Sequence, residues 1–408
     1  MQAENKRQPF RAPIYRTAKG NTSGDCVMIE SGSISNYTRS EFLRLCVRTA
    51  GSAAVLCAVP GKSMAQTTPV KKPVKGSANS FTCDMRGFVR WILDEFEPSV
   101  RLSGGAGRYA SSPGRTVPAL YGVADMACSL YTVGELYTSE ADRAQWLDAF
   151  ELFQNPGTGW FRENEPTKLS PQHNTAFALA AMELLDFAPR YPVKLGAEYS
   201  NPRAYLNTLN WRTNVYSDSH LGAGVGSICA LVPALHSTRW FAEYFATCDS
   251  LFDNKNGLMG RDKPPDGDTD QIGGTFHYSF LYQCFNRQMP YPEKRIDTVL
   301  RLQREDGYWS PTNHLWMTLD AIFLMTRTSR YCPHRLEDIR ASVRRILKVL
   351  QRDVFSPEGR KKTFAPAESV HSLTAAISIA AEAQQFLGVH EVITDWPLKL
   401  VLDRRPFI

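Results

Sequence analysis

Two kinds of helical segment alternate along the chain from residue 81 onward, and this alternation constrains the fold more than any other feature. One kind is amphipathic and charged, as in "FTCDMRGFVRWILDEFE" (81–97) and "TSEADRAQWLDAFELFQ" (138–154). The other kind is apolar and almost uncharged, as in "SPQHNTAFALAAMELL" (170–185). A helix with one polar face lies at a surface, whereas a helix that is apolar on all sides is enclosed. The alternation therefore predicts surface helices around enclosed ones.

The pair of helices recurs six times at intervals of roughly fifty residues, which is an internal repeat. Six surface helices around six enclosed helices predict an all-α fold, an (α/α)6 toroid over residues 81–390. Long loops are expected before the enclosed helices, on one face of the toroid, where binding and catalysis usually occur. The further amphipathic segments are 202–211, 238–252, 293–305 and 335–354, and the apolar ones are expected to begin near Thr116, His173, His220, Thr275, His314 and His371.

The first 65 residues are predicted to be an export leader. "TRSEFLR" (38–44) precedes a mild apolar run (49–59), and Ser63 and Ala65 stand at the −3 and −1 positions of a cleavage point near Ala65. The segment resembles a twin-arginine leader, with Ser40 in place of the second Arg. We therefore expect a periplasmic or secreted protein, although a disordered tail with a chance apolar patch is the alternative. The ranges that remain are a Pro/Lys/Ser linker at 66–80 and a C-terminal extension at 391–408.

The charge balance argues against a nucleic-acid partner. The leader holds nine Lys or Arg and four Asp or Glu, and the remaining residues hold 38 and 37. A nucleic-acid binder usually keeps its positive charge on the folded domain. No other apolar run approaches the length of a membrane span, so none is expected in the mature protein. The six Cys of the body have no CxxC spacing, which argues against a thiolate zinc site.

The helical repeat resembles the six-hairpin toroids shared by many glycosidases, uronate lyases, sugar epimerases and terpenoid cyclases. "LQREDGYW" also has Gln303, Gly307 and Trp309 in the Q-x3-G-x-W spacing of cyclase toroids. The resemblance covers most of residues 81–390 and implies the fold. It leaves the chemistry open, because toroids host many reactions.

Five of the eight His residues are expected in the opening turns of the enclosed helices. In a toroid these helices run together, so their first turns line one mouth. Each imidazole would then lie near the positive end of a helix dipole, which favours the neutral form. A neutral imidazole can accept a proton, donate one or bind a metal. We predict that these rings surround one cavity, the alternative being that each only caps its own helix: His173, His220, His277, His314 and His371.

"TNHLW" (312–316) is similar to the Asn-Asn-His-x-Tyr-Trp segment of toroidal alginate lyases. The resemblance implies that Asn313 neutralises a uronate carboxylate and that His314 abstracts the C5 proton. His277 and Tyr278 form another candidate pair, of which only one faces the centre, because adjacent helix positions point about 100° apart. Competing proton donors are Tyr121, Tyr216 and Tyr308.

Carboxylates are the alternative catalytic groups, because two carboxyl groups across a cavity can hydrolyse a glycosidic bond. The loop 263–274 carries three of them, and they could also bind calcium or simply form a solvated loop. The full set is Asp266, Asp268, Asp270, Glu163, Glu165 and Asp218.

Aromatic and basic side chains on the same rim are candidates for substrate binding. Trp160, Trp309 and Trp316 could stack on sugar faces, unless they pack the rim. An anionic substrate could be attracted by Arg108, Arg115, Arg261 and "GRKK" (359–362). The "GAGVGS" segment (222–227) is interpreted as small residues for close helix packing, since no strand precedes it.

The leading hypothesis is an exported enzyme that acts on a carbohydrate, such as a uronate-containing glycan, by proton abstraction, as in a lyase or an epimerase. The base is His314 or His277, the acid a rim Tyr, and the neutralising group Asn313 or Arg261. An inverting glycoside hydrolase that uses Asp268 or Glu163, and a non-catalytic periplasmic binding or assembly protein, are the alternatives. No cofactor is predicted; a divalent metal held by His residues with Asp218 or Asp270 is a further alternative.

Overall fold

The computed structural model describes residues 81–136, 139–164, 170–232, 235, 237–264, 267–312, 314–365 and 369–404. The chain divides into two units, Met1–Pro69 and Val70–Ile408, and all of these residues belong to the second. The leader and its cleavage point near Ala65 lie outside the described residues. In the described part, regular structure is almost entirely helical, which confirms the all-α prediction. The two short strands, β1 (Cys83–Asp84) and β2 (Val392–Ile393), pair in parallel.

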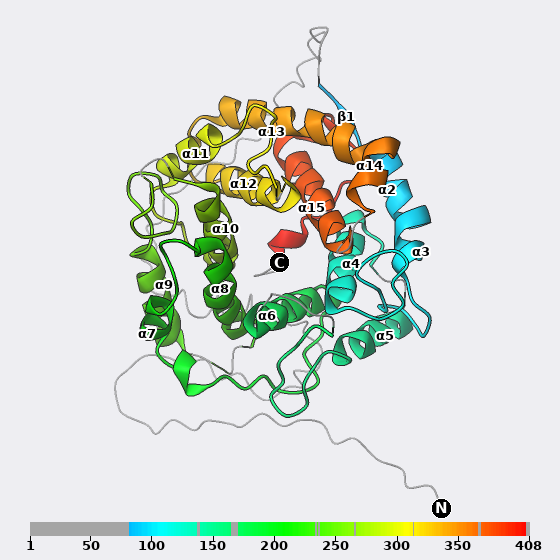
Figure 1. The fold of residues 1–408 in the computed structure, drawn as a ribbon, viewed down its shortest axis with the longest axis horizontal. Coiled ribbons are helices and arrows are strands. Elements are labelled where there is room, and N and C mark those ends of the chain that lie inside the picture. The colour runs from blue at the N-terminus through cyan, green and yellow to red at the C-terminus, as the bar shows by residue number, and fades with distance from the viewer. Residues whose placement is uncertain are drawn as a thin grey trace, which may run out of the picture. The chain divides into compact units, whose positions relative to one another are not determined.

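The apolar segments form helices that pack on one another in sequence order. Each inner helix contacts the next, and α15 returns to contact α4, so the contacts close a circle (Figure 1). These inner helices are α4 (Leu120–Val133), α6 (Pro171–Met182), α8 (Val215–Leu231), α10 (Thr269–Cys284), α12 (His314–Ser329) and α15 (Ser369–Leu387).

The amphipathic segments form the helices outside this circle (Figure 1). Their apolar stripe packs inward, and their charged residues remain at the surface. The first of them is continuous from α2 (Arg86–Trp91) through a π-helical turn at Ile92–Phe96 to α3 (Glu97–Val100). The others are α5 (Glu140–Glu151), α7 (Pro202–Asn207), α9 (Thr238–Asp249), α11 (Pro292–Arg301), α13 (Leu336–Leu350) with a π-helical turn at Gln351–Phe355, and α14 (Pro357–Thr363).

Glycines let the inner helix α8 approach its neighbours closely. A Cβ at Gly222 would overlap the hydroxyl of Tyr278 on α10, and a Cβ at Gly226 would lie 2.5 Å from the hydroxyl of Tyr244 on α9. The Tyr244 hydroxyl instead donates to the carbonyl of Gly222 at 2.9 Å. The structure therefore agrees with the interpretation of "GAGVGS" as a packing segment.

Two inner helices begin more than one turn earlier than the sequence predicts, at Val215 for α8 and at Thr269 for α10. Carboxylates explain both starts. Asp270 accepts hydrogen bonds from the backbone N–H groups of Val215 and Tyr216, each at 3.0 Å, and Asp268 accepts from that of Gln271 at 2.9 Å. A carboxylate satisfies the free N–H groups of a helix start and complements its dipole. As a result, His220 and His277 lie beyond the first turn of their helices.

A buried ion pair joins the last two inner helices. Arg327 on α12 and Glu382 on α15 have side chains that are 6% and 2% exposed, and two guanidinium nitrogens reach the carboxylate. Arg327 also pairs with Asp403, from the segment predicted as a C-terminal extension. That segment is tied to the inner helices at other points too, since the N–H of Lys399 donates to the carbonyl of Thr132 at 2.8 Å.

The six described cysteines, from Cys83 to Cys332, are free thiols. Among the described helices, none combines the length and apolarity needed to cross a membrane.

Candidate functional site

Aromatic and imidazole rings from neighbouring inner helices form a continuous row inside the circle. His371 lies 4.9 Å from Tyr121 between ring centroids, and Tyr121 lies 6.0 Å from His173. His173 lies 4.6 Å from His220, which lies 4.3 Å from His277. The row thus joins α15, α4, α6, α8 and α10, helices that are far apart in the sequence.

Residues beside this row complete a set to which all six inner helices contribute. Trp316 of α12 stacks on His371 with centroids 4.0 Å apart, and Tyr216 of α8 lies 5.1 Å from His220. Asp125 of α4 accepts a hydrogen bond from His371, and Asp320 of α12 lies beside Tyr216 at the α10 backbone. We call the set the central cluster: Tyr121, Asp125, His173, Tyr216, His220, His277, Trp316, Asp320 and His371.

Three of the inner helices supply two members of the cluster four residues apart. The pairs are Tyr121 with Asp125, Tyr216 with His220, and Trp316 with Asp320. Positions i and i+4 lie on the same helix face, one turn apart. The cluster therefore has a first layer near the helix starts and a second layer one turn deeper.

The first layer has accessible surface, and most of the second does not. Tyr121, Tyr216, His220, Trp316 and His371 are partly exposed. The carboxyl-bearing residues beneath them are buried, Asp125 at 0% and Asp320 at 1%, as are His173 and His277 at 4% each. Several residues of the cluster therefore have accessible surface, which distinguishes the cluster from dry core packing.

Hydrogen bonds fix the orientation of three imidazoles. His371 Nδ1 lies 2.9 Å from Asp125 Oδ2, so Nδ1 carries the proton and the neutral ring keeps Nε2 as its acceptor. His173 Nδ1 lies 2.8 Å from the hydroxyl of Tyr121. His277 Nδ1 lies 2.7 Å from Ser219 Oγ.

Enclosure suppresses charge in the cluster. Burial, helped by the neighbouring His371, lowers the pKa of His220 to about 3. Burial and the proximity of His220 lower the pKa of His277 well below its ordinary value. Burial also raises the pKa of Asp320 well above its ordinary value. At pH 7 both histidines are therefore neutral, and the main cause is loss of water rather than the helix dipole. For Asp320, burial favours the neutral acid.

Several buried polar atoms of the cluster have no hydrogen-bond partner among the described residues. They are Asp125 Oδ1, Trp316 Nε1 and Asp320 Oδ2. Folded proteins leave few buried polar groups unpaired, and such groups usually bind water or a ligand. Three of them in one cluster indicate a place where a polar molecule binds.

His314 lies apart from the central cluster, although it is the first residue of α12. Its exposed ring packs against Tyr308, with centroids 4.6 Å apart. Trp316 faces the cluster instead, because residues two positions apart on a helix point in nearly opposite directions. Asn313, the other half of the lyase-like segment, lies outside the described residues. The pKa of Tyr308, a competing donor, is raised to about 12 by burial.

Of the pair His277 and Tyr278, the imidazole faces the cluster. Tyr278 points away, into packing with Trp211 at 5.5 Å and Tyr244 at 6.3 Å between centroids. In the part of the chain that the structure describes, its buried hydroxyl has no hydrogen-bond partner.

The described carboxylates that were predicted as catalytic groups accept hydrogen bonds from backbone N–H groups at helix N-termini and in loops. Asp268 and Asp270 cap α10 and α8 and share Lys263 as an ion-pair partner. Glu163 accepts from the N–H groups of Leu120 and Tyr121, each at 3.0 Å, and so caps α4. Asp218 accepts from the N–H of Asn210 at 2.6 Å. Glu165 and Asp266 lie outside the described residues.

Of the predicted substrate-binding residues, Tyr121 and Trp316 belong to the cluster and the others do not. Trp309 is 1% exposed and donates its indole N–H to Val299. Trp160 donates its indole N–H to Lys194, and Arg261 is exposed and donates to Asn207. Arg115 is exposed in the loop before α4.

Sequence reasoning missed Asp125 and Asp320, although both carry a detectable signal. Acidic residues are almost never fully buried unless they are paired or functional. An Asp in the middle of an otherwise apolar, enclosed helix is therefore a candidate site residue. No group of three or more His, Cys, Asp or Glu that could hold a metal ion occurs among the residues described.

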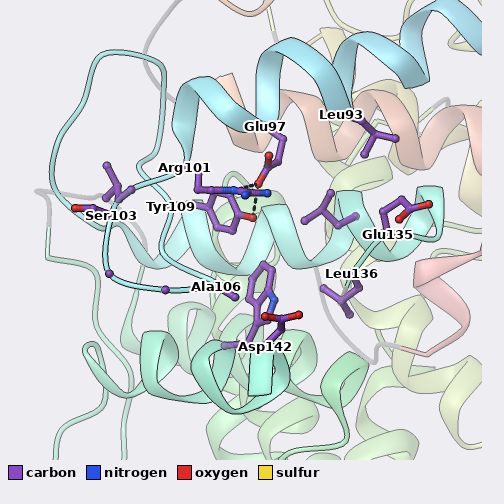
Figure 2. A pocket seen from close by; sticks show the side chains of 14 residues that line it. Leu93, Glu97, Arg101, Ser103, Ala106, Tyr109, Glu135, Leu136 and Asp142 are labelled. Carbon is purple, nitrogen blue, oxygen red and sulfur yellow. Dashed lines mark hydrogen bonds and ion pairs between the residues drawn. The ribbon is translucent and has the colours of Figure 1, made fainter. Parts of the chain in front are cut away.

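A hollow of about 710 Å³ lies outside the circle of inner helices, between α3, α4 and α5 (Figure 2). Glu97 lies at its wall and accepts from Arg101 at 2.7 Å and from Tyr109 at 2.5 Å. In the part of the chain that the structure describes, no buried side-chain polar atom lining this hollow lacks a hydrogen-bond partner. Its polar groups satisfy one another, so the central cluster is the better candidate site.

The chain matches no model of a known protein family, and it matches no curated protein.

Proposed function

We propose that the chain is an (α/α)6 toroid and a carbohydrate-active enzyme that moves protons with His371 and Tyr121. The observation that carries this proposal is the unbroken row of rings from His371 through Tyr121 and His173 to His277. The closed circle of inner helix contacts supports the toroid. The export leader expected from the sequence is consistent with action on an extracellular or periplasmic glycan.

His371 has the features of a general base. Its Nδ1–H is held by the buried carboxyl of Asp125, which leaves Nε2 free to accept a proton. A carboxylate in this position fixes the tautomer of an imidazole and stabilises the imidazolium that forms. The His371 side chain is 21% exposed, so a substrate can reach it.

Tyr121 is the matching acid. Its ring meets His371 edge to face at 4.9 Å, and its hydroxyl is hydrogen-bonded to His173. β-Elimination requires a base and an acid beside the bound sugar, and epimerisation requires them on opposite faces of the reacting carbon; each group contributes about 10²–10⁴-fold. The partly exposed indole of Trp316 supplies a flat surface on which a sugar ring can stack.

A second candidate reaction, hydrolysis, draws on Asp125 and Asp320. Their environments differ, since Asp125 is hydrogen-bonded to His371, whereas burial raises the pKa of Asp320. Unequal carboxyl groups of this kind divide the roles of base and acid in glycoside hydrolysis.

A panel of uronate and neutral polysaccharides, incubated with the purified protein, tests the proposal. The lyase form predicts ultraviolet absorbance of an unsaturated sugar end on at least one uronate polymer, and the epimerase form predicts a change of sugar configuration in NMR spectra. New reducing ends without unsaturation would favour hydrolysis instead. Binding without any product would contradict an enzymatic role and favour the binding or assembly protein.

A further inference from the structure

We propose that Asp320 donates a hydrogen bond to the substrate oxygen on which negative charge develops when His371 removes a proton. The inference rests on the proposed function and adds to it the group that makes proton removal from carbon feasible. The sequence assigned this role to Asn313 or Arg261.

Asp320 lies beside the rings of the cluster because of its position on α12 and because a glycine of α10 faces it. It lies one turn below Trp316, which stacks on His371. On the neighbouring helix α10, a Cβ at Gly273 would overlap the ring of Tyr216 and lie 3.1 Å from Asp320 Oδ2. Tyr216 in turn contacts His220 and His277. Because Gly273 has no side chain, the carboxyl group of Asp320 and the ring of Tyr216 can both lie against the backbone of α10.

Asp320 is available as a donor because it is buried and lacks a partner at one oxygen. The residue is 1% exposed, and none of the described residues is a hydrogen-bond partner of Oδ2. Burial is the cause of its raised pKa. Burial therefore favours the neutral carboxylic acid, and its O–H needs an acceptor that the described residues do not supply at Oδ2.

The reaction needs such a donor. Breaking the C–H bond next to a sugar carboxylate sends the proton to His371 Nε2 and the electron pair onto the carboxylate oxygens. The charged intermediate then collapses: a C=C bond forms, the C–O bond to the leaving sugar breaks, and Tyr121 gives its proton to the leaving oxygen. Proton transfer from the imidazolium of His371 to the phenolate of Tyr121 restores both groups. A neutral acid in a site poor in water stabilises the intermediate without repelling the substrate carboxylate.

The other groups nominated for this task are engaged elsewhere or uncharged. Arg261 is exposed and donates to Asn207, and no Lys or Arg belongs to the central cluster. His277 is hydrogen-bonded to Ser219 and neutral at pH 7. Asp320 is thus the best-placed hydrogen-bond donor of the described cluster.

Two substitutions and a control on the same helix test the inference. On the uronate polymer that wild type degrades best, Asp320→Ala is expected to lower kcat by about 10²–10³-fold with little change in KM, because a donor used mainly in the transition state is lost. Asp320→Asn keeps a weaker donor and should lose less. Thr318→Val is the control, because Thr318 is buried on α12 but does not belong to the cluster.

Infrared difference spectra provide a readout that is independent of turnover. The spectrum of wild type minus that of the Asp320→Asn variant should show the C=O band of a protonated carboxyl at pH 7. Added pectate or alginate should shift this band. Absence of the band, or a kcat for Asp320→Ala within threefold of wild type, would overturn the inference while lyase activity itself could stand. A band that shifts with either polymer although no polymer yields product would instead overturn the proposed function and leave Asp320 as a ligand-binding donor. A band that no polymer shifts, without product, would overturn both.

Discussion

Replacement of His371 by alanine is expected to lower kcat on the best polymer by about 10²–10⁴-fold, the usual contribution of a general base. His371 is the imidazole whose Nδ1–H is held by a buried carboxyl and whose ring remains accessible. Asp125→Asn should produce a loss of similar kind, because an amide no longer selects the tautomer with Nε2 as acceptor. The measurement is the rate of unsaturated product formation at saturating substrate.

His390→Ala is the matched control for this prediction, because His390 is exposed and outside the cluster. Its kcat should equal that of wild type. If His371→Ala retains a wild-type rate on a polymer that wild type cleaves, His371 is not the base.

Removal of Glu382 is expected to lower the free energy of unfolding by about 3–5 kcal/mol, since Glu382→Leu leaves the buried guanidinium of Arg327 without its main partner. Both side chains are nearly inaccessible, and the pair joins α12 to α15, two consecutive inner helices. Urea unfolding followed by circular dichroism measures the change. The double variant Arg327→Met with Glu382→Leu should recover part of the loss, because no unpaired charge remains buried.

A surface ion pair provides the comparison. Arg335 and Asp338 are 41% and 57% exposed, so Asp338→Ala should cost at most about 1 kcal/mol. A Glu382→Leu variant as stable as Asp338→Ala would mean that the Arg327 pair does not hold the two helices together.

The all-α class could be predicted from the sequence because hydrophobic periodicity records which helix faces are covered. The start of α6 was predicted to within one turn for this reason, since Ser170 provides an ordinary cap. The starts of α8 and α10 were misplaced because their caps are carboxylates whose partners emerge only on folding: Asp270 follows Val215 by 55 residues.

The site was predictable in part. The sequence identified His173, His220, His277 and His371 as residues of one neighbourhood, and the structure brings their rings together. The sequence could not tell which face of α12 turns inward, and so it favoured His314 over Trp316. It also proposed the acidic loop at Asp268 and missed the isolated Asp125 and Asp320, because burial depends on how the helices pack.

Enclosure of the cluster also has a consequence for stability. The pKa of His220 is about 3 in the folded protein and 6.5 in the reference state, so the unfolded chain binds the proton more readily. The contribution of this group to stability is complete above pH 6.5 and is lost as the pH falls towards 3. The loss amounts to about 2 kcal/mol at pH 5.

The central claim is that imidazoles from separate helices meet in one enclosed cluster, and NMR titration of the histidine side chains tests it most directly. Spectra of wild type, assigned with His220→Gln and His277→Gln variants, follow each ring from pH 8 to pH 5. Both imidazoles are expected to stay neutral over this range in the folded protein and to titrate near 6.5 in urea. Titration of both rings near 6.5 in the folded protein would contradict the account.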